Sequence, residues 1–515
     1  MNPTFREANT NNRRIAKNTL LLYVRMFLTM CISIYTSRIL LASLGIVDYG
    51  IYNVVGGLVG MLAFLNGSLI NSSQRFLTYS LGRGQDGDLS KVFSHIFLIH
   101  ASLALLVIVL CESVGIWLLE AKLVIPEERM FAARLAFQMS ILSMAVGMLY
   151  VPFNALVIAH ERMSFFAYLS IFEVTLKLAI AFAITSFAGD KLMLYASLIA
   201  LTQACIWICY SLYCRYKFPS VRFIPNFSRA KLKEILGFVS WNTFASVAVM
   251  LMFQGINLIL NVFFGPVLNA ARSLALQVQH ALMQLYVNFQ MAINPQITKS
   301  YALDDLMRMH SLMFASVKVS FVIMWTIALP FFFVSDYVLS LWLVEVPAFT
   351  AIFMKMGLCI AVVDAISNPF IVGCMATGRI RSIMVICGSL FCLVLPITYV
   401  LFLLGLPPQY AYVVHFSITL LAFFIRLVLV DKLIRFGLWR FVRSGLFPMA
   451  LVLLVSFALL YSFHLLYEEE NFMKLVLVCC FSLAAVSLSS YFILLNEGER
   501  AFVTAIFRKR FRKTH

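Results

Sequence analysis

The sequence predicts an all-α polytopic membrane protein with about fourteen transmembrane helices. Of its 515 residues, 62% are hydrophobic and only 12% are charged, a balance that excludes an ordinary soluble enzyme. Apolar runs of about 20 residues, long enough to cross a bilayer as a helix, recur along the whole chain. The 11 cysteines include no C-x-x-C pair, so neither a zinc site nor a disulfide framework is expected, and no cofactor is implied.

The apolar runs give the expected membrane spans in order. We place them near residues 18–42, 49–72, 92–115, 131–158, 164–187, 192–213, 236–263, 267–294, 310–335, 349–374, 381–404, 408–431, 445–466 and 472–495.

Basic residues gather in alternate connections between these spans. The basic set includes the N-terminal segment, the connector 214–234 and the tail 508–513, whereas the opposite connections carry mostly Asp and Glu. Because cytoplasmic loops are enriched in Lys and Arg, both termini are predicted to be cytoplasmic. Topology and anionic lipid head groups therefore account for the net charge of +17, and no nucleic-acid partner is expected.

The first two spans are separated by a short polar break. Gly45 and Gly50 bracket Asp48 there, which predicts a tight turn. The second span then carries small and polar residues at helical spacing, so they share one face: Asn53, Gly57, Gly60, Phe64 and Ser68. Such a face either packs closely on another helix or lines a wet cavity.

A basic, proline-containing connector divides the chain near its middle. Residues 214–234 include Pro219 and Pro225 and join the sixth span to the seventh. We therefore expect an N-terminal lobe (1–213) and a C-terminal lobe (235–435), each of six helices. The last two spans and a basic cytoplasmic tail (436–515) form an appendage.

An internal repeat supports this division. A shift of 220 residues superposes Gly45 on Gly265, and a shift of 217 superposes Pro152 on Pro369. An even number of spans separates the equivalent positions, so the lobes are predicted to be parallel repeats related by a pseudo-two-fold axis along the membrane normal.

The repeat extends the polar face of the second span to the eighth. Under the 220-residue shift, its five positions map to Ser273, Gln277, His280, Gln284 and Asn288. Leaving these hydrogen-bonding groups in lipid would cost several kcal/mol. We therefore expect a polar cavity between the lobes, lined by spans two and eight.

Four short segments carry a family resemblance. Residues 18–25, 37–40, 44–52 and 74–78 resemble the start of Wzx-type polysaccharide flippases. These belong to the MATE-like (multidrug/oligosaccharidyl-lipid/polysaccharide, MOP) superfamily. The resemblance implies translocation of undecaprenyl-pyrophosphate-linked oligosaccharide to the periplasmic leaflet by alternating access, for O-antigen, capsule or exopolysaccharide. It also implies the bacterial cytoplasmic (inner) membrane, with a polysaccharide polymerase or other assembly proteins as partners.

A pyrophosphate head group favours basic residues inside the membrane. Four basic candidates lie within the spans: Arg25 in span one, Arg272 near the outer start of span eight, Lys318 in span nine and Arg426 in span twelve. Arg38 lies near the outer end of span one, and both Arg38 and Arg272 have the alternative of reaching the membrane interface. In related lipid II flippases, arginines on spans one, two and eight line the cavity. Span two has no mid-membrane arginine here, a departure from that pattern.

Three further positions have two interpretations each. Arg75 is either a first contact for phosphate or part of a solvated helix end. Asp364, four residues before Asn368, is a carboxylate for ion coupling or the partner of a buried base. Lys177 lies one helical turn after Glu173, which predicts a structural ion pair.

The nearest rival function is a MATE-type, ion-coupled exporter of small organic cations. Such an exporter should carry several carboxylates within its lobes, whereas the deep charges here are more often basic. A membrane enzyme is the other alternative. His280 stands alone in its span without a base or metal-ligand constellation, so the chain is not expected to be an enzyme.

Overall fold

The fold is entirely helical in the part of the chain that the structure describes. This computed structural model describes residues 3–60, 62, 64–84, 86–121, 125–224, 228–342, 346–467, 469, 471–501 and 504. Within these ranges, 12 helices are long and apolar enough to cross a membrane. The chain is therefore a multi-pass membrane protein, and the predicted fold class is confirmed.

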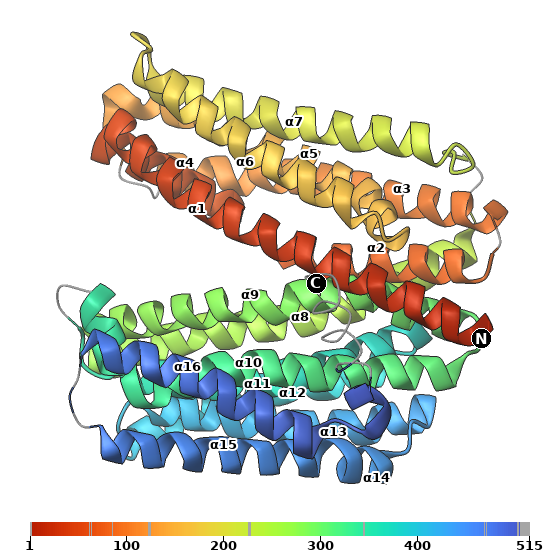
Figure 1. Cartoon of the computed structure of the whole chain (residues 1–515). Helices are drawn as coiled ribbons and strands as arrows, with labels where there is room; N and C mark the ends of the chain where they lie inside the picture. The colour runs from red at the N-terminus through yellow and green to blue at the C-terminus, as the bar shows by residue number, and fades with distance from the viewer. Residues whose placement is uncertain are drawn as a thin grey trace, which may run out of the picture. The chain divides into compact units, whose positions relative to one another are not determined.

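The helices form two compact units (Figure 1). Unit 1 comprises Met1–Val247 and Thr298–Asp305, and unit 2 comprises Ala248–Ile297 and Leu306–His515. The basic tail 505–515 lies outside the described residues. The lobes 1–213 and 235–435 and the appendage 436–515 remain predictions.

Unit 1 contains α1 (Pro3–Gly60), α2 (Phe64–Gly82), α3 (Asp86–Leu110), a π-helical turn (Cys111–Gly115), α4 (Ile116–Ala121), a 3-10 turn (Glu127–Arg129), α5 (Met130–Ala159), α6 (Met163–Thr185) and α7 (Lys191–Lys217). Two helices contribute to both units: α8 (Arg229–Phe264) and α9 (Pro266–Ala302). Unit 2 continues with α10 (Leu306–Trp342), α11 (Thr350–Thr377), α12 (Arg381–Leu403), α13 (Tyr410–Ile434), α14 (Leu438–Phe441), a π-helical turn (Val442–Leu446), α15 (Phe447–Leu466), α16 (Phe472–Ser489) and a last π-helical turn (Ser490–Leu494).

The predicted break between the first two spans lies at Gly45. This residue has φ 75° and ψ 169°, a backbone conformation that L side chains rarely adopt, and it kinks α1. Asp48, expected in a turn, instead lies in the helix that resumes after the kink. The expected span 49–72 is also interrupted, because this helix ends at Gly60 and α2 begins at Phe64.

Gly265 has the same role in unit 2. Its φ is 81°, and it separates α8 from α9, as Gly45 separates the two parts of α1. The two glycines paired by the sequence repeat therefore share a positive φ, each at a break between two helical segments.

Spans two and eight are not among the 12 apolar helices. They correspond to the second part of α1 with α2, and to α9. Their Asn, Gln, Ser and His side chains lower the hydropathy of these segments, although the chain is helical in both.

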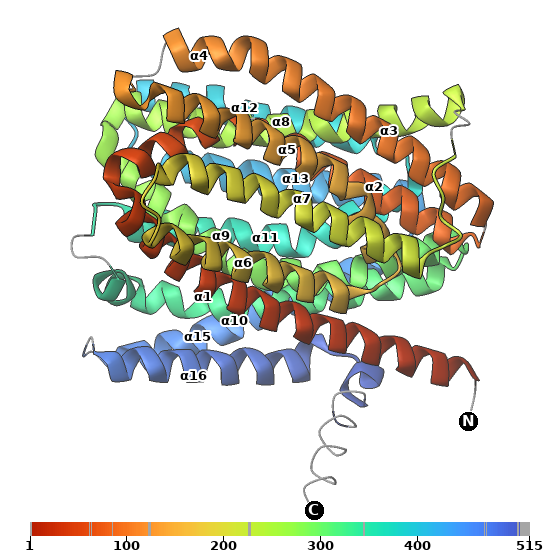
Figure 2. The same cartoon turned by 90° about the horizontal axis from the view of Figure 1, so that it is seen from above.

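A central helix organises each unit. In unit 1, α5 packs against α1, α2, α3 and α7. Alanines dominate its buried side and allow neighbouring helices to approach closely: Ala132, Ala133, Ala136, Ala145, Ala155 and Ala159. In unit 2, α11 packs against α10 and α13, and the last two long helices, α15 and α16, lie side by side (Figure 2).

The connector is attached to α3 by successive polar side chains. The Ser90 hydroxyl donates to the carbonyl of Ser220 at 2.8 Å, and the Ser94 hydroxyl accepts from the amide of Ile224 at 2.8 Å. One ring nitrogen of His95 accepts from the amide of Ser228 at 3.0 Å. These bonds satisfy backbone groups of an extended segment, so its described part is held on unit 1.

The last residues of α9 complete unit 1. A Cβ atom at Gly82 would lie 2.6 Å from the Cβ of Ala302 and 3.2 Å from the backbone of Lys299. The Lys299 ammonium also pairs with the Glu161 carboxylate at 2.9 Å. Only glycine at position 82 therefore permits this approach.

Candidate functional site

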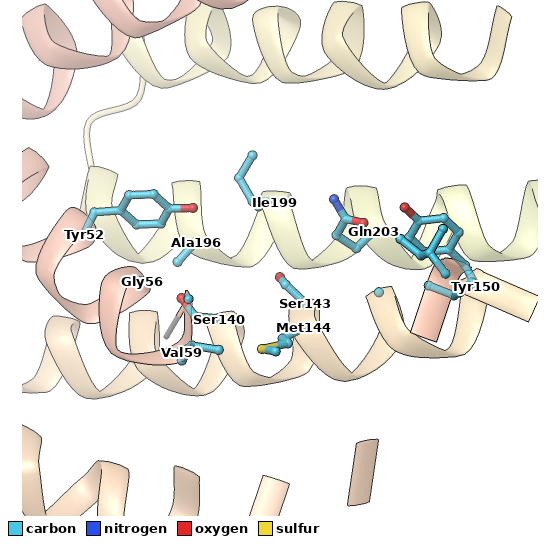
Figure 3. Close-up of a pocket in the computed structure, with 14 residues that line it drawn as sticks. Tyr52, Gly56, Val59, Ser140, Ser143, Met144, Tyr150, Ala196, Ile199 and Gln203 are labelled. Atoms are coloured by element: carbon cyan, nitrogen blue, oxygen red, sulfur yellow. The ribbon is translucent and has the colours of Figure 1, made fainter. Parts of the chain in front are cut away.

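A pocket of about 370 Å³ lies within unit 1. Its walls come from the second part of α1, from α2, α5 and α7 (Figure 3). The lining residues are Tyr52, Gly56, Val59, Gly60, Ile70, Ser140, Ser143, Met144, Gly147, Tyr150, Val151, Ala196, Ile199 and Gln203. On α5, positions 140, 143, 147 and 150 follow helical spacing, so one face of this helix meets the pocket.

The pocket has a mainly apolar lining with a few hydroxyl and amide groups, and its lining residues carry no formal charge. Hydroxyl and amide groups converge on it from Tyr52, Ser143 and Gln203 (Figure 3). The ring of Tyr52 meets Tyr195 edge-on at 4.8 Å, and Tyr150 stacks on Tyr210 at 5.5 Å. Rigid aromatic rings beside hydroxyl and amide groups suit a neutral, hydrogen-bonding ligand.

The glycines of the second span border open space. Ideal Cβ atoms at Gly56, Gly57 and Gly60 would meet no atom of the described residues within 4 Å, and Gly56 and Gly60 line the pocket. No helix in the described part of unit 1 packs closely on these glycines. The side chain of Asn53, which belongs to the same predicted face, lies outside the described part of the structure.

Gly147 offers a test of this pocket. A Cβ at Gly147 meets nothing within 4 Å, so Gly147→Ala should raise the free energy of unfolding by about 0.5–1 kcal/mol by removing a mid-helix glycine. Gly147→Leu should be as stable as Gly147→Ala, but its leucine side chain should fill the pocket and impair function. Thermal unfolding of the two purified variants, compared with a cell-based activity assay, separates these effects. A Gly147→Leu variant with full activity would argue against a functional pocket.

One charged pair and one arginine lie near the pocket. As predicted, Lys177 pairs with Glu173, at 2.6 Å, and the Gln203 amide donates to the same carboxylate at 3.2 Å. The Arg25 guanidinium lies 4.6 Å above the ring of Phe166. The structure thus brings Arg25 into unit 1, against an aromatic face.

Arg272 has a buried, uncharged environment in unit 2. It is 1% exposed, so the alternative that it reaches the membrane interface is wrong. Its guanidinium donates to the carbonyl of Phe253 at 3.1 Å and to the side-chain oxygen of Asn257. Among the described residues no carboxylate pairs with Arg272, and its Nε has no hydrogen-bond partner.

Neutral polar groups and hydrophobic residues complete the surroundings of Arg272. They come from α8, α9 and α13 and comprise Phe253, Ile256, Leu276, Gln279, Ala411, Tyr412 and His415. Among the described residues the cation is therefore enclosed by neutral groups without a countercharge, in a space with no room for a water molecule. An anion reaches Arg272 only when these surroundings open.

The residues of the predicted polar face of α9 differ in their solvent exposure. Gln277, His280 and Gln284 are exposed, whereas Asn288 is buried and donates to the carbonyl of Gln284 at 2.8 Å. The expected inter-lobe cavity remains a prediction.

A second polar cluster in unit 2 surrounds Asp364. Gln290 donates to the Ser320 hydroxyl at 2.9 Å and to the Ala365 carbonyl at 3.0 Å, and it accepts from Asn368 at 2.5 Å. Arg426 donates to the Ser367 hydroxyl and acts electrostatically on Asp364. Asp364 therefore lies near a buried base, Arg426, and its chain neighbour Ala365 belongs to the hydrogen-bonded cluster.

The remaining predicted cations have separate environments. Arg75 is 7% exposed, because α2 continues to Gly82, so the solvated helix end is the wrong interpretation. Its guanidinium lies 4.5 Å from the centre of the Phe76 ring. Lys318 pairs with Glu499 at 2.7 Å, so its charge is already neutralised. Arg38 is exposed.

Sequence reasoning missed most residues that line the unit 1 pocket. The signal was present on α5, where Ser140, Ser143 and Tyr150 follow helical spacing within an apolar span. It was weak because isolated serines in membrane helices commonly donate to their own backbone, as Ser140 does to the Ala136 carbonyl at 2.8 Å.

Comparisons with known proteins establish the fold. No family model matches the chain, and no curated protein matches it. Among solved structures, a MATE protein in its bent conformation superposes with a TM-score of 0.68 at 11% identity, covering 84% of this chain and 96% of that one.

Two further solved structures give similar agreement. An outward-facing multidrug resistance MATE family transporter of the MOP superfamily has a TM-score of 0.66 at 13% identity, over 82% of this chain and 96% of that one. The third is a MOP superfamily transporter from Pyrococcus furiosus, whose reversed pocket polarity suggests a different function. It has a TM-score of 0.65 at 12% identity, over 82% of this chain and 96% of that one. The chain therefore has the fold of MATE and MOP transporters.

Proposed function

We propose that the chain is a membrane transporter that flips undecaprenyl-pyrophosphate-linked oligosaccharide from the cytoplasmic to the periplasmic leaflet of a bacterial inner membrane. Both termini are cytoplasmic in this proposal, and the product feeds polysaccharide synthesis such as that of O-antigen or capsule. The MATE and MOP fold supports transport. The likeness of the first eighty residues to Wzx-type flippases supports the substrate.

The sign of the buried charges carries the proposal. Among the described residues the buried basic side chains outnumber the buried acidic ones five to one: Arg75, Arg272, Lys318, Arg426 and Lys474 against Glu161. Arg272 is the strongest case, because its hydrogen-bond acceptors are neutral. A buried cation without a countercharge is expensive, and an anionic ligand would offset that cost.

The pocket in unit 1 fits the other part of such a substrate. A glycan presents many hydroxyl groups and no pyrophosphate charge, and the lining residues Tyr52, Ser143 and Gln203 can exchange hydrogen bonds with it. In this proposal unit 1 contacts the sugar and Arg272 contacts the pyrophosphate when its surroundings open. Asp364, beside Arg426, takes the role of the ion-coupling carboxylate.

A MATE-type exporter of small organic cations is the second candidate. The solved structures that share this fold include a multidrug resistance transporter, which favours it. Asp364 is its best cation-binding group, but the neighbouring Arg426 opposes a second positive charge there. The buried charges therefore favour the anionic substrate.

Deleting the gene tests the two candidates together. Loss of a flippase should trap undecaprenyl-pyrophosphate glycan in the cytoplasmic leaflet and reduce surface polysaccharide. Expression of the wild-type chain should reverse both effects. Unchanged lipid-linked glycan together with increased sensitivity to cationic drugs would overturn the proposal and favour the exporter.

A further inference from the structure

Three helix starts in unit 1 are joined by a single arginine. The Arg129 guanidinium contacts Asp48 at 2.8 and 2.6 Å and Asp190 at 2.6 and 3.3 Å. Asp48 follows the Gly45 kink of α1, Arg129 immediately precedes α5, and Asp190 is the N-cap residue of α7. We refer to Asp48, Arg129 and Asp190 as the arginine clamp.

The clamp lies close to the unit 1 pocket along α1 and α7. Tyr52, which lines the pocket, is one helical turn after Asp48, about 6 Å along the axis. Tyr195, which contacts Tyr52 edge-on at 4.8 Å, is five residues after Asp190. The three helices that the clamp joins are thus the helices that supply most of the pocket wall.

The geometry of the clamp is specific to arginine. The planar guanidinium binds both carboxylates through two nitrogens each, whereas a lysine ammonium is a point charge. The side chains of Arg129, Asp48 and Asp190 are only 27%, 17% and 19% exposed, so water screens these pairs incompletely.

Asp190 remains ionised in the clamp. Burial alone would raise its pKa, but hydrogen bonds from Arg129 and from the amide of Met193 hold the pKa below its usual range. The clamp therefore has two negative charges and one positive charge at neutral pH. It is a bridge of fixed length between α1, α5 and α7.

We propose that Arg129 is a positioning residue for the pocket, in that its guanidinium sets the separation of the three helices at the Tyr52 end and keeps that end closed. Arg129 itself does not line the pocket. The role of this pocket in transport rests on the proposed function, but the control of its access by Arg129 does not. Opening of the pocket at this end requires release of at least one carboxylate.

Access to the pocket can be measured directly. In a Ser143→Cys background, the rate of maleimide labelling at position 143 is followed by peptide mass spectrometry, which separates it from the native cysteines. Adding Arg129→Gln should increase this rate on the order of tenfold, as expected for the loss of charge-assisted hydrogen bonds. Arg129→Lys should bring the labelling rate only part of the way back to that of the Ser143→Cys background, because lysine lacks the planar guanidinium.

Two further variants separate positioning from general destabilisation. Arg134→Gln is the matched control, since Arg134 also lies at the start of α5 and pairs with Glu120 at 2.8 Å on an exposed surface; labelling should not change. Asp190→Asn keeps an oxygen that can cap α7 but removes the charge, so it should open the pocket without unravelling the helix.

The outcomes distinguish this proposal from the proposed function. Equal labelling rates for Arg129→Gln, Asp190→Asn and Arg134→Gln would overturn the positioning role, whatever the chain transports. A labelling rate in Arg129→Lys equal to that of the Ser143→Cys background would also overturn the positioning role, because a positive charge alone would then keep the pocket closed. Faster labelling of the Arg129→Gln variant, together with unchanged lipid-linked glycan after deletion of the gene, would support the clamp and reject the flippase.

Discussion

Arg272→Met is expected to raise thermal stability and to abolish glycan export. Arg272 is 1% exposed, and its acceptors in the described part of the chain, among them the Phe253 carbonyl and the Asn257 side chain, are neutral. Removing its charge ends a large desolvation cost, whereas the two acceptors left behind cost about 1 kcal/mol each or somewhat more. We expect a net gain on the order of 1–2 kcal/mol in the free energy of unfolding.

The loss of function has a separate cause. If Arg272 receives the pyrophosphate, the neutral methionine removes the charge-assisted hydrogen bonds that offset dehydration of this group. Export measured in a deletion strain should then fall by about a hundredfold or more, equivalent to about 3 kcal/mol of lost binding. Thermal unfolding of the purified variant and quantification of surface polysaccharide measure the two effects.

A matched variant makes this prediction specific. Arg272→Lys retains the positive charge but not the planar fork, so part of the export should remain while stability changes little. A methionine variant that is less stable than the wild type would mean that Arg272 is structural. One that exports glycan normally would remove Arg272 from the site.

Gly82→Ala should destabilise unit 1 even though alanine is the better helix former. The added Cβ would lie 2.6 Å from the Cβ of Ala302 and 3.2 Å from two backbone atoms of Lys299. Overpacking of this kind costs about 1–3 kcal/mol. Displacing Lys299 would also weaken its pair with Glu161, whose side chain is only 4% exposed, so the total loss should reach about 3–5 kcal/mol.

A double-mutant cycle measures this contact. Ala302→Gly removes the atom that lies nearest the added Cβ, so Gly82→Ala combined with Ala302→Gly should recover more than 1 kcal/mol relative to additivity. Gly147→Ala, where a Cβ meets nothing within 4 Å, is the control and should change stability in the opposite direction. Additive effects in the cycle would contradict the close approach of Gly82 and Ala302.

Features that depend on neighbouring residues could be predicted from the sequence. The apolar runs predicted the helices, Gly45 predicted the first break, and the four-residue spacing of Glu173 and Lys177 predicted their ion pair. Each follows from helical periodicity or from glycine's access to positive φ.

Features that depend on tertiary contacts could not be predicted from the sequence. Arg129 and Asp48 are 81 residues apart, and Lys318 and Glu499 are 181 residues apart. No periodicity relates such pairs, so Lys318 was interpreted as a substrate contact although its charge is paired. The pocket was missed for a similar reason. Its lining residues come from four helices, and the residues from each helix alone resemble ordinary membrane sequence.

The path of α9 has a consequence for dividing the gene. Residues 266–297 of this helix belong to unit 2, but Thr298–Asp305 belong to unit 1, where Lys299 pairs with Glu161. A half-protein truncated at the connector would therefore lack Ala302 beside Gly82 and the counterion of a nearly buried carboxylate. Such fragments should be degraded when made singly and should regain function only when both are produced in the same cell.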